Sequence, residues 1–255
     1  MKTLGILGAM HEEVASIVYA MKRPRTRQLA RREFISGELF GQRVVVAQSR
    51  WGKVASAVSA THLIQTFKCD SLIFTGVAGS LDERVRVGDL VVARRLYQHD
   101  LDASPLFEPM EIPLLGRTHL DTDRGLRAML LKGSRAFVRL DSRAMLDAVS
   151  RVELGVTKPR VFEGDIVTGD QFVSSVKVAR GIKARVPRAL CVEMEGASVA
   201  QVCYEHEVPM AVIRTISDNA DHGSPVDFPR FLQAVAGVYA VGVMRRALER
   251  SGAER

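Results

Sequence analysis

Cysteine and aromatic residues are scarce in this sequence, and long uncharged apolar runs are missing from it. The 255 residues include three cysteines, Cys69, Cys191 and Cys203, and 6% aromatic residues. An odd number of widely spaced cysteines in apolar stretches argues against both a disulfide framework and a CxxC metal site, and favours a reducing compartment. No run reaches the roughly 18 uncharged apolar residues of a membrane helix, and the N-terminus leads into a strand pattern rather than an export signal. We therefore expect a cytoplasmic protein with no membrane partner.

Acidic residues are absent from one strongly basic segment. The net charge is +7, and six of the cations lie close together: Lys22, Arg23, Arg25, Arg27, Arg31 and Arg32. Charge of this sign can indicate nucleic-acid binding, but no aromatic residues are interleaved here to stack on bases. We interpret the segment as a solvated basic edge and predict no nucleic-acid partner, with anion or nucleic-acid binding as the open alternative.

An alternation of strand and helix patterns runs along the chain. Apolar, β-compatible runs predict strands, and apolar residues at three- and four-residue steps predict helices. The predicted strands are 3–9, 44–47, 72–75, 90–93, 160–168 and 210–216. The predicted helices are 10–21, ended by Pro24, then 53–67, 174–184, 196–204 and a long C-terminal helix that includes 228–239. Only the stretch from about Gln98 to Asp123, with three prolines, is expected to be long and irregular.

This alternation predicts an α/β protein formed by one domain over residues 1–255. A mixed, mostly parallel sheet would lie between helices, and a ligand would bind where the carboxyl ends of strands meet loops.

Two acidic residues open the first predicted helix, directly after a strand that ends in glycine. The segment Gly5–Val14 lacks the GxGxxG fingerprint and the Walker lysine, so it gives no support for phosphate binding. Glu12 and Glu13 fit two interpretations. They could compensate the helix dipole, or one could be a catalytic base that the helix N-terminal amides keep ionised.

Two acids also interrupt the apolar segment Val192–Ala197. In an extended chain Glu193 and Glu195 would point to the same side, and acids in an apolar stretch are costly unless they are paired or functional.

Another segment, Thr75–Ser80, is rich in small residues. It is compatible with a tight turn or with close approach of the backbone to a ligand.

A polar cluster, Arg214–Asp221, follows the last predicted strand. Ser217 or Asp218 could cap a helix, and Arg214 could equally orient a functional Asp218. The pair His99 and Asp100 has no second group of ligands at a recognisable spacing, so we predict no metal site.

Seven motifs occur in an order that resembles the methylthioadenosine/S-adenosylhomocysteine nucleosidases of the purine nucleoside phosphorylase superfamily. They are Gly8–Val14, Trp51–Lys53, Thr75–Gly79, Val87–Val91, Thr168–Phe172, Val192–Glu195 and Arg214–Asp218. The resemblance spans nearly the whole chain. It implies a nucleoside phosphorylase-like, three-layer α/β/α sandwich that needs no cofactor or metal. It also implies a homodimer, with the region around 97–107 often at the subunit interface, and hydrolysis of the bond between adenine and the ribose of a 5'-thio-substituted nucleoside.

The resemblance further implies a role for each matched residue. Asp218 would protonate adenine at N7, and Glu13 would deprotonate the water that attacks the anomeric carbon. Glu195 would hold the ribose hydroxyls. The other implied substrate-binding positions are Met194 against the sugar, Phe172 and Val173 at adenine, Phe228 near the sulfur, Ala78, Gly79 and Trp51 in the pocket, and Ser217 and Arg214 in support of Asp218.

Two positions depart from the family pattern. Val77 stands where the family usually has a serine, and Trp51 stands where a smaller aliphatic residue is common. They leave open which 5' substituent is preferred, and whether futalosine or deoxyadenosine is the main substrate. They also leave two alternative functions open: a purine nucleoside phosphorylase and a nucleoside-binding relative without catalysis. A phosphorylase is disfavoured because Glu13 would repel phosphate and Val77 donates no side-chain hydrogen bond.

Overall fold

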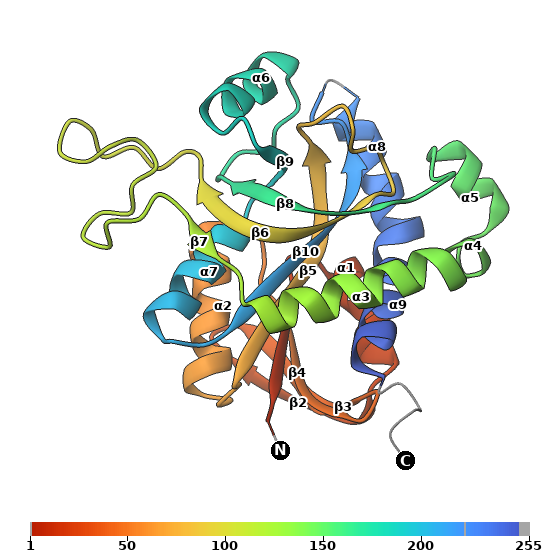
Figure 1. Cartoon of the computed structure of the whole chain (residues 1–255). Helices are drawn as coiled ribbons and strands as arrows, with labels where there is room; N and C mark the ends of the chain where they lie inside the picture. Colours follow the sequence, from red (N-terminus) through yellow and green to blue (C-terminus); the bar gives the residue numbers. More distant parts are fainter. Residues whose placement is uncertain (1, 222, 250–255) are drawn as a thin grey trace.

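A ten-stranded mixed sheet forms the centre of the molecule, with helices on both of its faces (Figure 1). The structure, a computed structural model, describes residues 2–221 and 223–249. The strands are β1 (Leu4–Gly8), β2 (Lys22–Leu29), β3 (Arg32–Leu39), β4 (Gln42–Gln48), β5 (Ser71–Ser80), β6 (Leu90–Gln98), β7 (Leu120–Asp121), β8 (Val161–Thr168), β9 (Ala189–Glu193) and β10 (Met210–Asp218). Their order is β10-β6-β8-β9-β5-β1-β4-β3-β2, with β7 beside β6.

Two groups of helices make the outer layers. The helical segments are α1 (His11–Tyr19), α2 (Lys53–Gln65), α3 (Arg124–Leu140), α4 (Ser142–Met145), α5 (Ala148–Glu153), α6 (Val176–Arg185), α7 (Gly196–Glu205), α8 (Ser224–Phe231), the π-helical turn η1 (Leu232–Ala236) and α9 (Gly237–Leu248). Helices α2 and α7 pack against each other, and α9 packs against both α1 and α3 on the other side of the sheet (Figure 1). The predicted α/β/α sandwich is confirmed.

Strand pairing brings several strand ends to one place. β5 runs parallel to β1 and β10, and its last residues pair with β9 in antiparallel fashion. In this register Gly79 lies opposite both Val192 and Asp218. The polar segments that follow β1, β9 and β10 therefore meet around the end of β5, as expected for ligand sites of α/β proteins.

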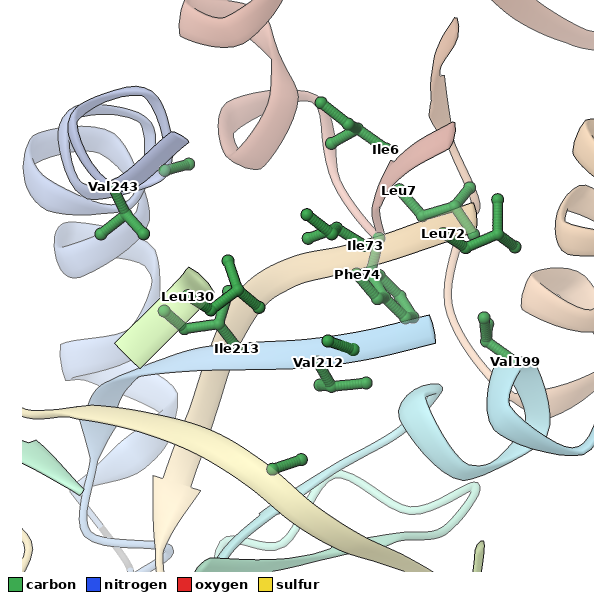
Figure 2. Packing of buried hydrophobic residues seen from close by; sticks show 14 of the residues in the cluster. Ile6, Leu7, Leu72, Ile73, Phe74, Leu130, Val199, Val212, Ile213 and Val243 are labelled. Carbon is green, nitrogen blue, oxygen red and sulfur yellow. The ribbon is translucent and has the colours of Figure 1, made fainter. Parts of the chain in front are cut away.

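The core lies around the three central strands. Ile6 and Leu7 of β1, Ile73 and Phe74 of β5 and Val212 of β10 are fully buried (Figure 2). Leu130 of α3, Val199 of α7 and Val243 of α9 cover them from the helical layers. Near-continuous burial along β5 and β10 explains why these strands read as unbroken apolar runs.

The N-terminal third contains a hairpin that the sequence analysis missed. Pro24 does not end a helix: α1 stops at Tyr19, and Pro24 lies within β2, an edge strand where a missing N–H is tolerated. The side chains of β2 are almost all exposed, so the basic segment is the predicted solvated edge. Polar residues occupy both faces of β2, so its sequence does not alternate between hydrophobic and polar residues. For this reason the strand was not predicted.

The long apolar helical region at the C-terminus belongs to the core. By length and mean hydropathy, 1.2, the segment Phe228–Leu248 could cross a membrane, but half of its most apolar window is buried inside the protein. Gly237 allows its close packing on α1, because a Cβ there would lie 2.6 Å from Ser16 Oγ. Helix α3, which the analysis did not predict, packs along α9. The predicted irregular stretch is confirmed, apart from β7 and one isolated bridge.

Candidate active site

A cleft opens where the polar segments meet. Of the twelve residues that the sequence predicted for the site, eleven line it, and Arg214 does not. The lining residues are Ala9, Met10, Glu13, Trp51, Val77, Ala78, Gly79, Gln171, Phe172, Val173, Val192, Glu193, Met194, Glu195, Ser217, Asp218 and Phe228. Apolar and aromatic walls with a few converging carboxylates are typical of small-molecule sites.

Glu13 is fixed to the backbone on both sides of the cleft. Its Oε2 accepts hydrogen bonds from the N–H groups of Ala9 (2.5 Å) and Met10 (3.0 Å), and its Oε1 accepts one from Val77 (2.9 Å). The side chain is 2% exposed, and burial raises its pKa, although the nearby Arg214 charge and the three N–H groups partly oppose this. The backbone N–H groups favour the anion, as expected for a base at this position, while burial opposes them and has the larger effect on the pKa of Glu13; a raised pKa suits a general base.

The glycine-rich segment Thr75–Ser80 is not a turn. It continues β5 as regular strand, and Gly76 is required because a Cβ there would lie 2.6 Å from Glu13 Oε1 and 3.1 Å from an Arg214 nitrogen. Gly79 is required in the same way, since its Cβ would lie 2.9 Å from Asp218 Oδ1. The small residues thus let both carboxylates approach one strand.

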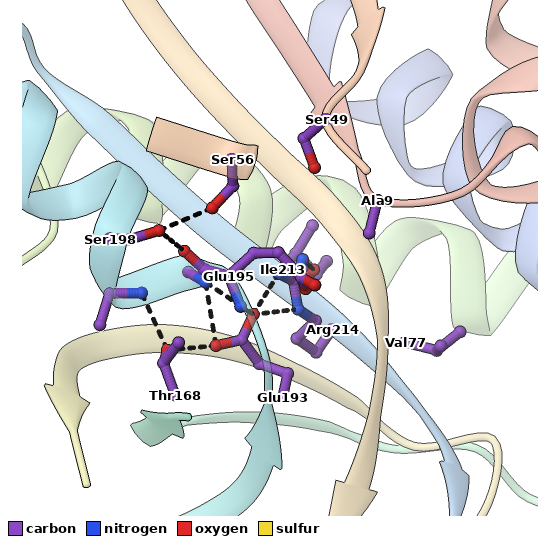
Figure 3. Close-up of polar contacts among 12 residues, drawn as sticks. Ala9, Ser49, Ser56, Val77, Thr168, Glu193, Glu195, Ser198, Ile213 and Arg214 are labelled. Atoms are coloured by element: carbon purple, nitrogen blue, oxygen red, sulfur yellow. Dashed lines mark hydrogen bonds and ion pairs between the residues drawn. The ribbon is translucent and has the colours of Figure 1, made fainter. Parts of the chain in front are cut away.

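Arg214 and Glu193 form a buried ion pair beneath the cleft (Figure 3). Glu193 also accepts hydrogen bonds from the Thr168 hydroxyl and the Gly196 N–H, and the Arg214 guanidinium lies 4.2 Å from the centre of the Phe74 ring. A buried charge pair needs such additional partners. The predicted support of Asp218 by Arg214 is therefore corrected: Arg214 holds Glu193 and lies beside Glu13.

Glu193 and Glu195 do not share one extended face. β9 ends at Glu193, and the chain turns before Glu195, whose backbone is no longer extended. Glu195 Oε1 accepts the Gly52 N–H at 2.9 Å, while its backbone oxygen accepts the Ser198 hydroxyl (Figure 3). Burial, together with the Glu193 charge, raises the pKa of Glu195. Both acids line the cleft, but the turn gives them different partners: Glu193 is paired with Arg214, whereas Glu195 has no ion-pair partner among the described residues.

Asp218 is held mostly by side-chain hydroxyls. Its Oδ2 accepts the Ser217 hydroxyl at 2.8 Å, and its Oδ1 accepts the Ser224 hydroxyl at 2.6 Å and the Ala220 N–H at 2.8 Å. It is 3% exposed. Neither Ser217 nor Asp218 caps a helix, because α8 begins later, at Ser224. This outcome removes the helix-cap interpretation.

Aromatic rings form the other wall of the cleft. The Phe228 ring meets Phe172 edge-on with centroids 5.3 Å apart, and it meets Trp51 edge-on at 6.1 Å. Trp51 is 52% exposed, so its indole lies at the mouth rather than deep inside. The prediction that Trp51 lines the pocket agrees with this position.

Several lining residues were not assigned from the sequence. Ala9 and Met10 precede Glu13 within its motif, and Gln171 precedes Phe172 within another. Their position inside these motifs is the feature of the sequence that could have identified them as lining residues. The described residues contain no cluster of three or more His, Cys, Asp or Glu side chains suited to a metal ion, and Asp100 pairs with Lys53 at 2.7 Å.

Comparisons with known proteins identify the family of the chain. Residues 3–248 match the model of the phosphorylase superfamily. The sequence is 34% identical over 229 residues to the 5'-methylthioadenosine/S-adenosylhomocysteine nucleosidase of Shewanella sediminis, covering 90% of this chain and 91% of that protein.

Solved structures show the same similarity. The Neisseria meningitidis nucleosidase of that name, in complex with methylthio-immucillin-A, superposes with a TM-score of 0.86 at 29% identity, covering 98% of this chain and 99% of that one. The Helicobacter pylori futalosine hydrolase superposes with a TM-score of 0.80 at 32% identity, covering 96% and 97%. The chain therefore belongs to the 5'-methylthioadenosine/S-adenosylhomocysteine nucleosidase family of the phosphorylase superfamily.

Proposed function

We propose that this protein is an N-glycosyl hydrolase that releases adenine from 5'-thio-substituted adenosines, with methylthioadenosine as its preferred substrate. One observation carries the proposal. The Glu13 carboxylate accepts a hydrogen bond from the Val77 N–H of β5. Asp218 lies against Gly79, two residues further along the same strand. Both side chains also line the same cleft, so a carboxylate suited to activate water and one suited to protonate a leaving base face one bound substrate.

In this proposal Asp218 donates a proton to N7 of adenine as the bond between N9 and the anomeric carbon breaks. Adenine then leaves as a neutral base, and positive charge develops on the ribose. Glu13 takes a proton from the water whose oxygen bonds to the anomeric carbon. Its burial supports this role, because the raised pKa makes the carboxylate a stronger base than an exposed one.

The cleft also offers groups for each part of the nucleoside. Phe172 provides a ring face for stacking on adenine, and Val173 provides backbone groups for its polar edge. Glu195 accepts hydrogen bonds from ribose hydroxyls, and Met194 packs on the sugar. Trp51 and Phe228, in edge contact, surround the 5' substituent.

Hydrolysis is favoured over phosphorolysis by the same residues. Glu13 would place negative charge against phosphate, and Val77 offers no hydroxyl. Arg214, the buried cation beneath the cleft, is already paired with Glu193.

Incubation with methylthioadenosine, with and without phosphate, tests the proposal. Release of adenine and the free thioribose in both conditions is expected. A sugar 1-phosphate would mean a phosphorylase, and binding without release of adenine would mean a non-catalytic relative; either result contradicts the proposal.

We further propose a cytoplasmic homodimer built from one domain over residues 1–255. Exposed Leu106 and Leu114, in the irregular stretch, support a protein contact there, because large apolar side chains on a loop favour burial by a partner. The three cysteines are buried and unpaired, which supports a reducing compartment. Sedimentation of the purified protein tests the dimer.

A further inference from the structure

A second hollow lies away from the cleft, between the end of α3, α4, α5 and the start of α9. Its volume is about 520 Å³, which is within the size range of small-molecule sites, roughly 300–1,000 Å³. The short helices α4 and α5 follow the end of α3 on the side of the molecule where α3 lies beside α9 (Figure 1). We name this hollow the α3–α5 groove.

Four cations surround the groove, and no lining residue is acidic. They are Arg139, Arg143, Arg151 and Lys158. Within residues 2–221 and 223–249, none of the four takes part in an ion pair, whereas neighbouring cations such as Arg230 and Arg246 are paired with Glu153 and Asp141. Like charges around one concave surface repel one another and create a positive potential that an anion would relieve.

Two polar groups at the groove are buried without a hydrogen-bond partner in the described structure. They are the Tyr239 hydroxyl, on a side chain that is fully buried, and the Arg151 Nε–H. Both belong to residues that line the groove. Buried donors normally have a partner, in the protein or in bound water, and these two donors lie at a hollow large enough to admit a ligand whose acceptor atoms would complete them.

The Tyr239 hydroxyl is suited to donate to an anion. Its ring packs edge-on against Phe137, with centroids 5.0 Å apart, so the side chain is held in place. Burial, with the nearby Asp89 charge, raises the pKa of Tyr239, and the hydroxyl therefore keeps its proton. Asp89 itself is neutralised by Arg160 at 2.9 Å, so it does not cancel the potential of the groove.

The remaining walls are apolar. Val138, Leu146, Val152 and Val156 line the groove beside the cations. Leu146 and Val156 are buried, whereas Val152 is 75% exposed. A bare inorganic ion would leave the exposed Val152 side chain in contact with water, while an apolar group attached to the anion would cover it.

We propose that the α3–α5 groove binds a small organic anion in which a phosphate or similar oxyanion is attached to an apolar body. The guanidinium groups of Arg143 and Arg151 and the Tyr239 hydroxyl donate hydrogen bonds to the oxyanion. The valine and leucine side chains pack against the apolar part. The nucleoside cleft shares no lining residue with this groove.

Calorimetric titration of the full chain with phenyl phosphate tests the proposal, with phenol and inorganic phosphate as comparison ligands. Saturable binding is expected, tighter for phenyl phosphate than for either comparison ligand. The double variant Arg143→Ala and Arg151→Ala should weaken it at least about tenfold, because hydrogen bonds to charged groups are lost. Tyr239→Phe should weaken it about fivefold without lowering thermal stability, since the hydroxyl has no partner to lose.

Arg135→Ala is the matched control, because Arg135 lies on the same helix and does not line the groove. It should leave binding unchanged, and all variants should cleave methylthioadenosine normally, which shows that they fold. Three results would overturn the proposal: no saturable binding of phenyl phosphate, equal loss in Arg135→Ala, or equal affinity for inorganic phosphate. Equal loss would mean a diffuse basic face that attracts any polyanion.

Discussion

The two carboxylates of the cleft are held in opposite ways. Glu13 is anchored by three backbone N–H groups, while Asp218 is anchored by two serine hydroxyls and one N–H. Backbone donors are built into the fold and are lost only on substitution by proline. Hydroxyl donors rotate and can accept as well as donate, so they can follow a carboxyl group that gains or loses a proton.

This difference matches the two proposed roles. A base that only orients and deprotonates water benefits from fixed donors and from burial that raises its pKa. An acid that transfers a proton to adenine benefits from partners that adapt to both of its protonation states. The predictions below test each half of this comparison.

The largest effect is expected at the acid. Asp218→Asn should lower kcat by roughly 10²- to 10⁴-fold, because the amide can hydrogen-bond to N7 but cannot deliver a proton. Nucleoside binding should remain, since the variant keeps shape and volume. Steady-state release of adenine and equilibrium binding measure the two effects. Turnover within about tenfold of the parent would remove Asp218 from the mechanism.

A comparable loss is expected at the base. Glu13→Gln should keep the fold but lose hydrolysis, again by roughly 10²- to 10⁴-fold, since an amide can hold water without accepting its proton. The matched control is Glu12→Gln, on the same first helical turn but outside the cleft lining. If both variants hydrolyse normally, Glu13 only stabilises the start of α1.

The pH profile should expose the burial of Glu13. The base works only when it is ionised, so kcat/KM should fall as the pH drops through its pKa. Because burial raises that pKa, this acid limb should lie above the usual range of an exposed glutamate, about 4.3. Measurements of kcat/KM over the acid and neutral range test the direction. An acid limb at or below the ordinary glutamate value would contradict the burial argument, and the residual activity of Glu13→Gln should not show the limb.

The layer architecture could be predicted from the sequence because its central strands are apolar throughout and alternate with amphipathic helices. The β2–β3 hairpin was not predicted, for the opposite reason. Its polar residues carry no hydrophobic period, and Pro24 suggested a helix end although an edge strand accepts proline. Local patterns cannot show that pairing with β4 provides the missing stabilisation.

The site was predictable as a set of residues but not as a network. Motif order identified the residues that line the cleft, yet adjacency along the chain linked Arg214 to Asp218, whereas the structure pairs it with Glu193. Side chains of a strand alternate between its two faces, and the partner of each depends on which side chains of neighbouring strands lie on the same face. That choice requires the sheet order, which no single motif contains.

A smaller effect is expected from the hydroxyl that holds the acid. Ser224→Ala should lower kcat about tenfold, because a hydrogen bond to a charged group is removed while two other donors stay. Ser134→Ala is a matched control, since the Ser134 hydroxyl is buried with no partner in the described structure. A fall in kcat with KM unchanged supports a positioning role. Equal loss of thermal stability in both variants, with kcat unaffected, would contradict it.

The smallest effect concerns the mouth of the cleft. The Trp51 indole adds apolar bulk next to Phe228, so methylthioadenosine should be favoured over S-adenosylhomocysteine, whose longer polar tail must pass this ring, by about tenfold in kcat/KM. Because the indole is half exposed, only part of this preference should depend on it. Trp51→Ile should therefore move the ratio of the two kcat/KM values toward S-adenosylhomocysteine by about threefold. Val54→Ala, at an exposed position of α2 outside the cleft lining, should leave the ratio unchanged. An unaltered ratio in Trp51→Ile would show that the indole covers the surface without shaping the pocket.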